Sequence, residues 1–166
     1  MILTGKEITR EVSSGNISIT PFFLDQINPN SYNYRLGETL KVFSQFDGVK
    51  SLFEEVRIPK EGYVLEPNKM YLSTTSEEIG SSVYAMSLIG RSSMGRLGLF
   101  LQVSADLGHT TSCHNWTLEL VASHSIRVYP WMVIGQVSFW ENKGEHNDYD
   151  GFYGNKNNVQ ESIIFI

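Results

Sequence analysis

Short apolar runs separated by turn residues make up most of the chain after residue 30. These runs are rich in Val, Ile, Tyr, Phe and Trp, and Gly, Pro and Asn stand between them, which is typical of strands joined by tight turns. We expect strands at residues 32–36, 56–58, 63–65, 70–73, 83–89, 99–103, 116–122, 125–129 and 133–140. Many short strands at this spacing predict a mainly β fold, either a distorted β-barrel or a jelly roll.

The beginning of the chain has a helical pattern instead. Thr4 and Glu7 have the spacing of a capping box, in which the hydroxyl and the carboxylate each satisfy a free backbone N–H of the first turn. Gly15 is suited to end a helix of about ten residues. A second short helix is expected at PFFLDQI, between Pro21 and Pro29, and we expect no further helix after residue 30.

The last 26 residues differ in composition from the rest. The segment ENKGEHNDYDGFYGNKNNVQES is polar and rich in Gly and Asn, so it lacks the apolar side chains that a core requires. We therefore expect one domain over residues 1–166, with residues 141–166 as a polar C-terminal tail. Such a tail is either disordered or a flap that becomes ordered over a ligand.

Composition excludes several classes of protein. A net charge of −5 leaves no surplus of Lys and Arg to neutralise a nucleic-acid polymer. The single cysteine, Cys113, excludes an internal disulfide framework and a four-thiolate metal site. No apolar run approaches the roughly 18 residues of a membrane span, and the first residues lack a secretory signal pattern. We expect a cytoplasmic protein that binds neither nucleic acid nor membrane.

The segment GRSSMGRLG, residues 90–98, concentrates groups that bind oxyanions. Glycine lets the backbone approach a ligand closely, serine hydroxyls donate to phosphate oxygens, and arginine provides forked, charge-assisted hydrogen bonds. A surface loop with two solvated arginines has the same composition, so both interpretations remain open at this point.

Glu119 is the acidic residue within the apolar segment WTLELV. Alternation puts Thr117, Glu119 and Val121 on one face of a strand, and Leu118, Leu120 and Ala122 on the other. The glutamate is therefore either an outward-facing residue of a half-exposed strand or an acid that faces a pocket. In a pocket, a carboxyl group is suited to proton transfer.

A loop between two expected strands carries four residue types that bind metals: Asp106, His109, Cys113 and His114. The loop lacks the H-x-E and P-C-x-x-C pattern of the zinc nucleobase deaminases. One cysteine is weak support for a metal site. We therefore expect no metal ion bound by protein ligands and no zinc.

Together these motifs resemble the dCTP deaminase branch of the trimeric dUTPase superfamily. The resemblance rests on MILTGKEI, INPNSYNYRLG, GRSSMGRLGLF, the glutamate of LEL, WMVIGQVSF and the tyrosines of the tail. It extends from residue 1 to about residue 162. It implies a distorted β-barrel with a short N-terminal helix, assembled as a homotrimer with nucleotide sites between subunits.

The resemblance also assigns residues to a pyrimidine nucleoside triphosphate. The family's residues that bind the phosphates, with the Mg²⁺ that these carry, match Arg91, Ser92, Ser93 and Arg96. Of these, Ser92 and Arg96 are also expected at the reacting centre. Glu119 matches the proton-transfer group for metal-free hydrolytic deamination at cytosine C4. Because no metal activates the water, a dry pocket with well-placed donors is required.

Further matching positions surround the base and the sugar. Ser104 and Ala105 match backbone groups of the base pocket, and Tyr149 and Tyr153 match the closing tail. Lys156 aligns near a glutamine of the family that contacts the base or the phosphates. His109 stands where the family has a sugar-side aspartate, and the Pro-Gly turn that follows this aspartate is absent.

The sequence therefore favours deamination of dCTP to dUTP and ammonia. Because the deaminating glutamate is present and the sugar-side aspartate is not, a modified or ribose-containing cytosine nucleotide is a variant of this hypothesis. A dUTP diphosphatase that forms dUMP and pyrophosphate is the first alternative. A nucleotide-binding or regulatory trimer without catalysis is the second, since the phosphate cradle and the catalytic acid lie on separate segments.

Overall fold

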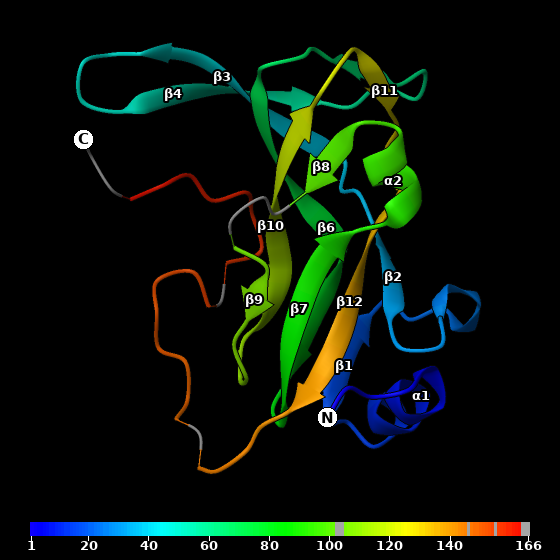
Figure 1. Cartoon of the computed structure of the whole chain (residues 1–166). Coiled ribbons are helices and arrows are strands. Elements are labelled where there is room, and N and C mark those ends of the chain that lie inside the picture. Colours follow the sequence, from blue (N-terminus) through cyan, green and yellow to red (C-terminus); the bar gives the residue numbers. More distant parts are fainter. Residues whose placement is uncertain (102–104, 146, 155, 164–166) are drawn as a thin grey trace.

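The computed structural model describes residues 1–101, 105–145, 147–154 and 156–163. Two helices, α1 (Gly5–Ser13) and α2 (Ser92–Arg96), and one 3₁₀ turn, η1 (Leu24–Gln26), accompany the strands (Figure 1). The strands are β1 (Ile17–Thr20), β2 (Tyr32–Arg35), β3 (Thr39–Phe46), β4 (Ser51–Arg57), β5 (Tyr63–Leu65), β6 (Met70–Ser81), β7 (Tyr84–Gly90), β8 (Leu99–Leu101), β9 (Leu107–Gly108), β10 (Cys113–Ala122), β11 (Ile126–Val128) and β12 (Val133–Glu141).

The strands form three antiparallel sheets. The largest has the order β4-β3-β6-β10-β8, with β1 also paired to β6. A second sheet has the order β2-β12-β7-β9, and β11 pairs with β5. Tyr34, Leu118 and Phe139, each fully buried, come from β2, β10 and β12 and belong to one hydrophobic core. The prediction of a mainly β fold with a short N-terminal helix is confirmed.

Helix α1 begins as its sequence predicts. The Thr4 Oγ1 accepts a hydrogen bond from the Glu7 N–H at 3.4 Å, and Gly15 takes a φ of +79° just beyond the helix. The Glu7 carboxylate pairs with Arg10 on the next turn. Ile8 is fully buried and fixes the helix to the core.

Two expectations about helices are wrong. PFFLDQI forms only the turn η1, because Leu24 is 70% exposed and Ile27 forms an extended bridge with Tyr32. Within GRSSMGRLG, the five residues of α2 are helical, whereas we expected no helix after residue 30. Their single turn is too short for a helical period to be visible, and Met94 packs it against the core.

The strand pattern is longer than expected. Strands β1, β3 and β9 were not predicted, and β6 extends to Ser81 instead of ending at residue 73. The second half of β6 hides its alternation because Thr75 and Glu77 are polar and yet buried. The strand expected at residues 99–103 is described only as far as Leu101.

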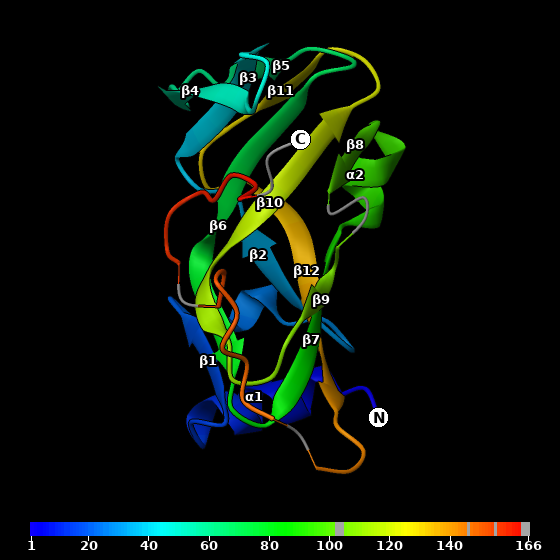
Figure 2. The same ribbon diagram turned by 90° about the vertical axis from the view of Figure 1, so that its left-hand side faces the viewer.

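After β12 the chain runs back along the large sheet. In both views the described residues of this tail, 142–145, 147–154 and 156–163, pass β9 and β10 towards the β3–β4 hairpin (Figures 1 and 2). Its backbone is held by side chains of the sheet, as described below. The described helices include none with the length and hydrophobicity to cross a membrane.

Candidate functional site

A cavity of about 720 Å³ lies between β10, the β3–β4 hairpin and the tail. Glu119 lines it from the middle of β10. The other side chains predicted from the sequence to surround a nucleoside also line this cavity: Ala105, His109, Tyr149, Tyr153 and Lys156. The fold thus brings together residues from the loop before β10, from β10 itself and from the tail. Their individual roles remain predictions.

Strand β10 has one face in the core and one face towards the cavity. Leu118, Leu120 and Ala122 are buried, whereas Thr117 and Glu119 are half-buried on the opposite face, as the alternation predicts. Among the described residues, none donates a hydrogen bond to the Glu119 carboxylate. A carboxylate in a partly enclosed cavity can accept a proton from water and, once protonated, donate it to a substrate.

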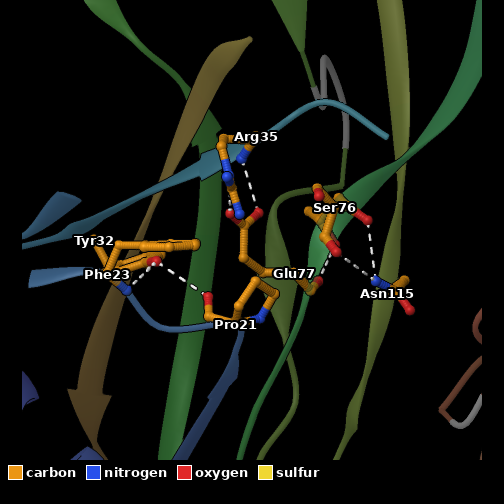
Figure 3. A network of polar contacts seen from close by, with 8 residues as sticks. Pro21, Phe23, Tyr32, Arg35, Ser76, Glu77 and Asn115 are labelled. Atoms are coloured by element: carbon orange, nitrogen blue, oxygen red, sulfur yellow. Dashed lines mark hydrogen bonds and ion pairs between the residues drawn. The ribbon is translucent and has the colours of Figure 1, made fainter. Parts of the chain in front are cut away.

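The direction of β10 is set by a β-bulge opposite its first half. The register with β6 shifts between Asn115 and Thr117, so that Asn115 pairs with Glu78 and Thr117 with Thr74. The Asn115 amide donates to the Thr75 and Ser76 carbonyls at 3.1 and 3.3 Å, which satisfies acceptors that the bulge removes from the ladder (Figure 3).

A buried ion pair between β2 and β6 supports the same bulge. The Glu77 carboxylate is fully buried, and it accepts hydrogen bonds from the Arg35 Nε at 2.6 Å and from the Arg35 backbone N–H at 2.9 Å (Figure 3). The guanidinium lies 4.6 Å from the centre of the Phe23 ring. This pair ties β2 to β6 where the bulge begins, so it helps to place Thr117 and Glu119.

The tail is held beside the cavity by contacts with the sheet and with the loop before β10. The Tyr149 N–H donates to the Thr111 Oγ1 at 2.9 Å, and the Gln160 N–H donates to the Thr117 Oγ1 at 3.1 Å. The Glu161 carboxylate pairs with Lys41 of β3 at 2.8 Å. These contacts place the described residues of the tail beside the cavity. Whether the tail closes over a ligand stays a prediction.

His114 and Trp116 form the cavity wall at the start of β10. Their rings lie 4.2 Å apart, and the Trp116 Nε1 donates to the Ile79 carbonyl at 2.8 Å. The His114 side chain is buried beside the Asn115 carbonyl, 3.1 Å from its Nδ1. Burial lowers the pKa of His114 below its ordinary value, which favours a neutral imidazole in the wall.

The GRSSMGRLG segment lines a different recess of about 460 Å³. Arg91 and Ser92 line it with Val121 of β10, whereas Ser93 and Arg96 are exposed nearby on α2. Val121 lies on the same face of β10 as Glu119, two residues further along, which is about 7 Å in a strand. The two groups of predicted residues therefore lie on one surface of the protein but in separate hollows.

The GRSSMGRLG side chains are available for a ligand. Among the described residues, none pairs with the side chains of Arg91, Ser92, Ser93 or Arg96. Also within the described part, no three His, Cys, Asp or Glu side chains are grouped so as to hold a metal ion. Ser104, predicted for the base pocket, lies outside the described residues.

Several residues of the cavity were not predicted from the sequence. The β3–β4 hairpin contributes Phe46, Lys50 and Phe53, and the tail contributes Gln160 beyond Lys156. The alternating segment at residues 39–46 was a visible signal for β3. The position of Gln160 required the path of the tail, since its contact with Thr117 spans 43 residues.

Comparisons with known proteins agree with this architecture. Residues 2–142 match the model of a family described as dCTP deaminase-like. The chain is 40% identical to "dCTP deaminase, dUMP-forming" of Clostridium botulinum (strain Alaska E43 / Type E3), over 99% of this chain and 97% of that protein. It is 41% identical to the protein of the same name from Hathewaya histolytica, over 99% of this chain and 98% of that protein.

The fold is also that of a solved structure. The crystal structure of 2'-deoxycytidine 5'-triphosphate deaminase from Agrobacterium tumefaciens superimposes with a TM-score of 0.69 at 22% identity, over 85% of this chain and 48% of that chain. This match confirms the predicted fold class. The expectation of an enzyme of the dCTP deaminase kind is likewise confirmed by the relatives. By its sequence over nearly its whole length, the chain belongs to the dCTP deaminase-like family.

Proposed function

We propose that this protein converts dCTP into dUMP by two hydrolytic steps. In the first, water replaces the amino group at cytosine C4, giving dUTP and ammonia. In the second, water cleaves dUTP into dUMP and pyrophosphate. The support for the product is the name shared by relatives that match 99% of this chain. This proposal replaces dUTP, which the sequence favoured as the released product, and joins the deaminase and diphosphatase hypotheses in one enzyme.

The observation that carries the proposal is the position of Glu119. Its carboxylate, to which none of the described residues donates a hydrogen bond, lines a partly enclosed cavity that is large enough for a nucleoside. In the first step the carboxylate takes a proton from water as the oxygen attacks C4, and passes a proton to the ring nitrogen N3. The emptied carboxylate then takes the remaining proton from the new hydroxyl at C4 and gives it to the amino group, so that the C4=O bond forms as the C4–N bond breaks and ammonia leaves. One carboxylate can perform these transfers in sequence, because it is regenerated after each one.

The tail supplies the dry environment that this chemistry needs. Tyr149, Lys156 and Gln160 of the tail line the cavity together with β10. Exclusion of bulk water strengthens every hydrogen bond to the developing charge at C4. The Trp116 ring gives the cavity wall an apolar surface.

We further propose that the phosphates are bound by the GRSSMGRLG segment of a neighbouring subunit in a homotrimer. Within one chain, the Arg91 recess and the Glu119 cavity are separate hollows on one surface. A cyclic trimer would place the recess of one subunit against the cavity of the next. Mg²⁺ would then be held by the triphosphate, where it would neutralise charge.

Subunit mixing tests the shared site. Glu119→Gln and Arg96→Ala homotrimers should each be inactive. When the two proteins are unfolded, mixed in equal amounts and refolded together, about a quarter of the sites combine an intact Glu119 with an intact Arg96. Recovery of about a quarter of wild-type turnover supports the shared site, and no recovery contradicts it.

A product assay tests the reaction itself. The protein is incubated separately with dCTP, dUTP and CTP, and ammonia, pyrophosphate, dUTP and dUMP are measured over time. The proposal expects ammonia and pyrophosphate in equal amounts from dCTP. Ammonia without pyrophosphate indicates deamination alone, and pyrophosphate from dUTP without ammonia from dCTP indicates a diphosphatase. Tight nucleotide binding with no product indicates the non-catalytic alternative.

A further inference from the structure

Thr111, in the loop before β10, has a backbone conformation that its side chain disfavours. Its φ is +73°, in the left-handed region. A β-branched residue is crowded there, whereas glycine is not. The backbone is held in this conformation from one side, because the Thr111 N–H donates to the Ser81 carbonyl at 2.7 Å. Strain of this kind persists only where the surrounding structure imposes it, and it is often found at functional sites.

The side chain of Thr111 makes a contact that glycine could not make. Its Oγ1 accepts the hydrogen bond from the Tyr149 N–H at 2.9 Å, and Tyr149 lines the Glu119 cavity. The ring of Tyr149 also stacks on His109, with centres 4.8 Å apart and planes 17° apart. The loop therefore holds Tyr149 both by its backbone and by its ring.

Tyr149 is in turn the centre of the tail's own structure. The chain turns closely around its ring, because a Cβ added at Gly151 would lie 2.3 Å from the Tyr149 ring, and one added at Gly154 would lie 2.6 Å from it. The turn is closed by the Gly154 N–H, which donates to the Gly151 carbonyl at 3.1 Å. The position of this turn is therefore set by the position of the Tyr149 ring.

We propose that Thr111 is a positioning residue, which docks Tyr149 and so holds the tail over the Glu119 cavity. The strained backbone aims the hydroxyl at the Tyr149 N–H, and the His109 ring gives the tyrosine a flat surface. For the activity readout alone, the inference rests on the proposed function. The docking of the tail is measured without substrate, so this readout does not depend on the proposed function.

Three variants separate the hydroxyl from the backbone strain. Thr111→Gly removes both, Thr111→Ala removes the hydroxyl and keeps most of the strain, and Thr111→Ser keeps the hydroxyl. Hydrogen exchange of the tail peptide at residues 147–154 is measured in the nucleotide-free protein. We expect exchange about threefold to tenfold faster in the glycine and alanine variants, corresponding to the loss of one hydrogen bond, and near wild type in the serine variant.

Thermal unfolding and kinetics complete the test. Because glycine relieves the strain, Thr111→Gly should unfold at a higher temperature than Thr111→Ala, although both free the tail to the same degree. Both should raise the KM for dCTP by a similar factor and leave kcat within about twofold. Wild-type tail exchange in both the glycine and the alanine variants would overturn the inference. If wild type released no ammonia, the proposed function would fail, and the exchange test would remain valid.

Discussion

The buried pair of Glu77 and Arg35 allows a quantitative prediction, because both partners are defined by short contacts. Glu77→Gln keeps the size of the side chain and removes its charge. The Glu77 side chain is fully buried, and that of Arg35 is 21% exposed. In the variant, the amide NH₂ faces one of the two N–H groups that donate to the carboxylate in the wild type. Removing one partner of a buried pair typically costs about 3–5 kcal/mol.

We expect a loss of about 3 kcal/mol in the free energy of unfolding, the lower end of that range, because the guanidinium keeps some access to water. Urea unfolding followed by tryptophan fluorescence measures it, since urea does not screen charges. All variants are compared at one protomer concentration, because assembly would add to the apparent stability.

A double-mutant cycle separates the pair from general packing. Arg35→Met should cost at least as much as Glu77→Gln, because it leaves an unpaired carboxylate in the interior. Glu77→Leu is measured alone to close the cycle, and combining it with Arg35→Met should cost less than Arg35→Met alone. A cost below about 1 kcal/mol for Glu77→Gln, or a double variant as unstable as the sum of its parts, would refute the reasoning.

Two further predictions follow from the site. Burial lowers the pKa of His114 below its ordinary value of 6.5, so the unfolded chain binds a proton at a higher pH than the folded chain does. The contribution of His114 to the free energy of unfolding should therefore be fully present above about pH 6.5 and be lost as the pH decreases below it. His114→Gln should flatten this pH dependence, measured by urea unfolding between about pH 7.5 and 5. In the proposed mechanism Mg²⁺ accompanies the phosphates and Glu119 transfers the protons, so EDTA should raise the KM for dCTP far more than it lowers kcat; complete loss of ammonia release at saturating dCTP would contradict this.

The local sequence pattern was sufficient to predict burial in β10, which packs one of its faces against the core. The alternation around Glu119 predicted which side chains of β10 face inwards, because Leu118 and Leu120 are apolar and their neighbours are not. The same reasoning failed on β6. Its buried Thr75 and Glu77 are satisfied by partners on other strands, so their burial follows from long-range hydrogen bonds that no local pattern reveals.

In the candidate site, too, the sequence predicted some features, whereas others depend on contacts between distant parts of the chain. Motifs placed Glu119 and the GRSSMGRLG segment in one function, but they did not show that the two lie in separate hollows of one chain. The composition of the tail allowed either disorder or a flap. Its order depends on single contacts across the fold, such as those of Thr111 with Tyr149 and of Thr117 with Gln160. The unusual backbone of Thr111 also has no signal in the sequence.

The central claim is that the Glu119 carboxylate transfers the protons of deamination, and Glu119→Gln tests it most directly. Glutamine has nearly the same size and still forms hydrogen bonds, but it cannot accept the proton of the attacking water. We predict that ammonia release from dCTP falls by about 10² to 10⁴, the usual contribution of a general acid–base group. Affinity for dCTP, measured by calorimetry, should stay within about threefold of wild type, a difference of less than about 1 kcal/mol. Undiminished ammonia release by the glutamine variant would contradict the account.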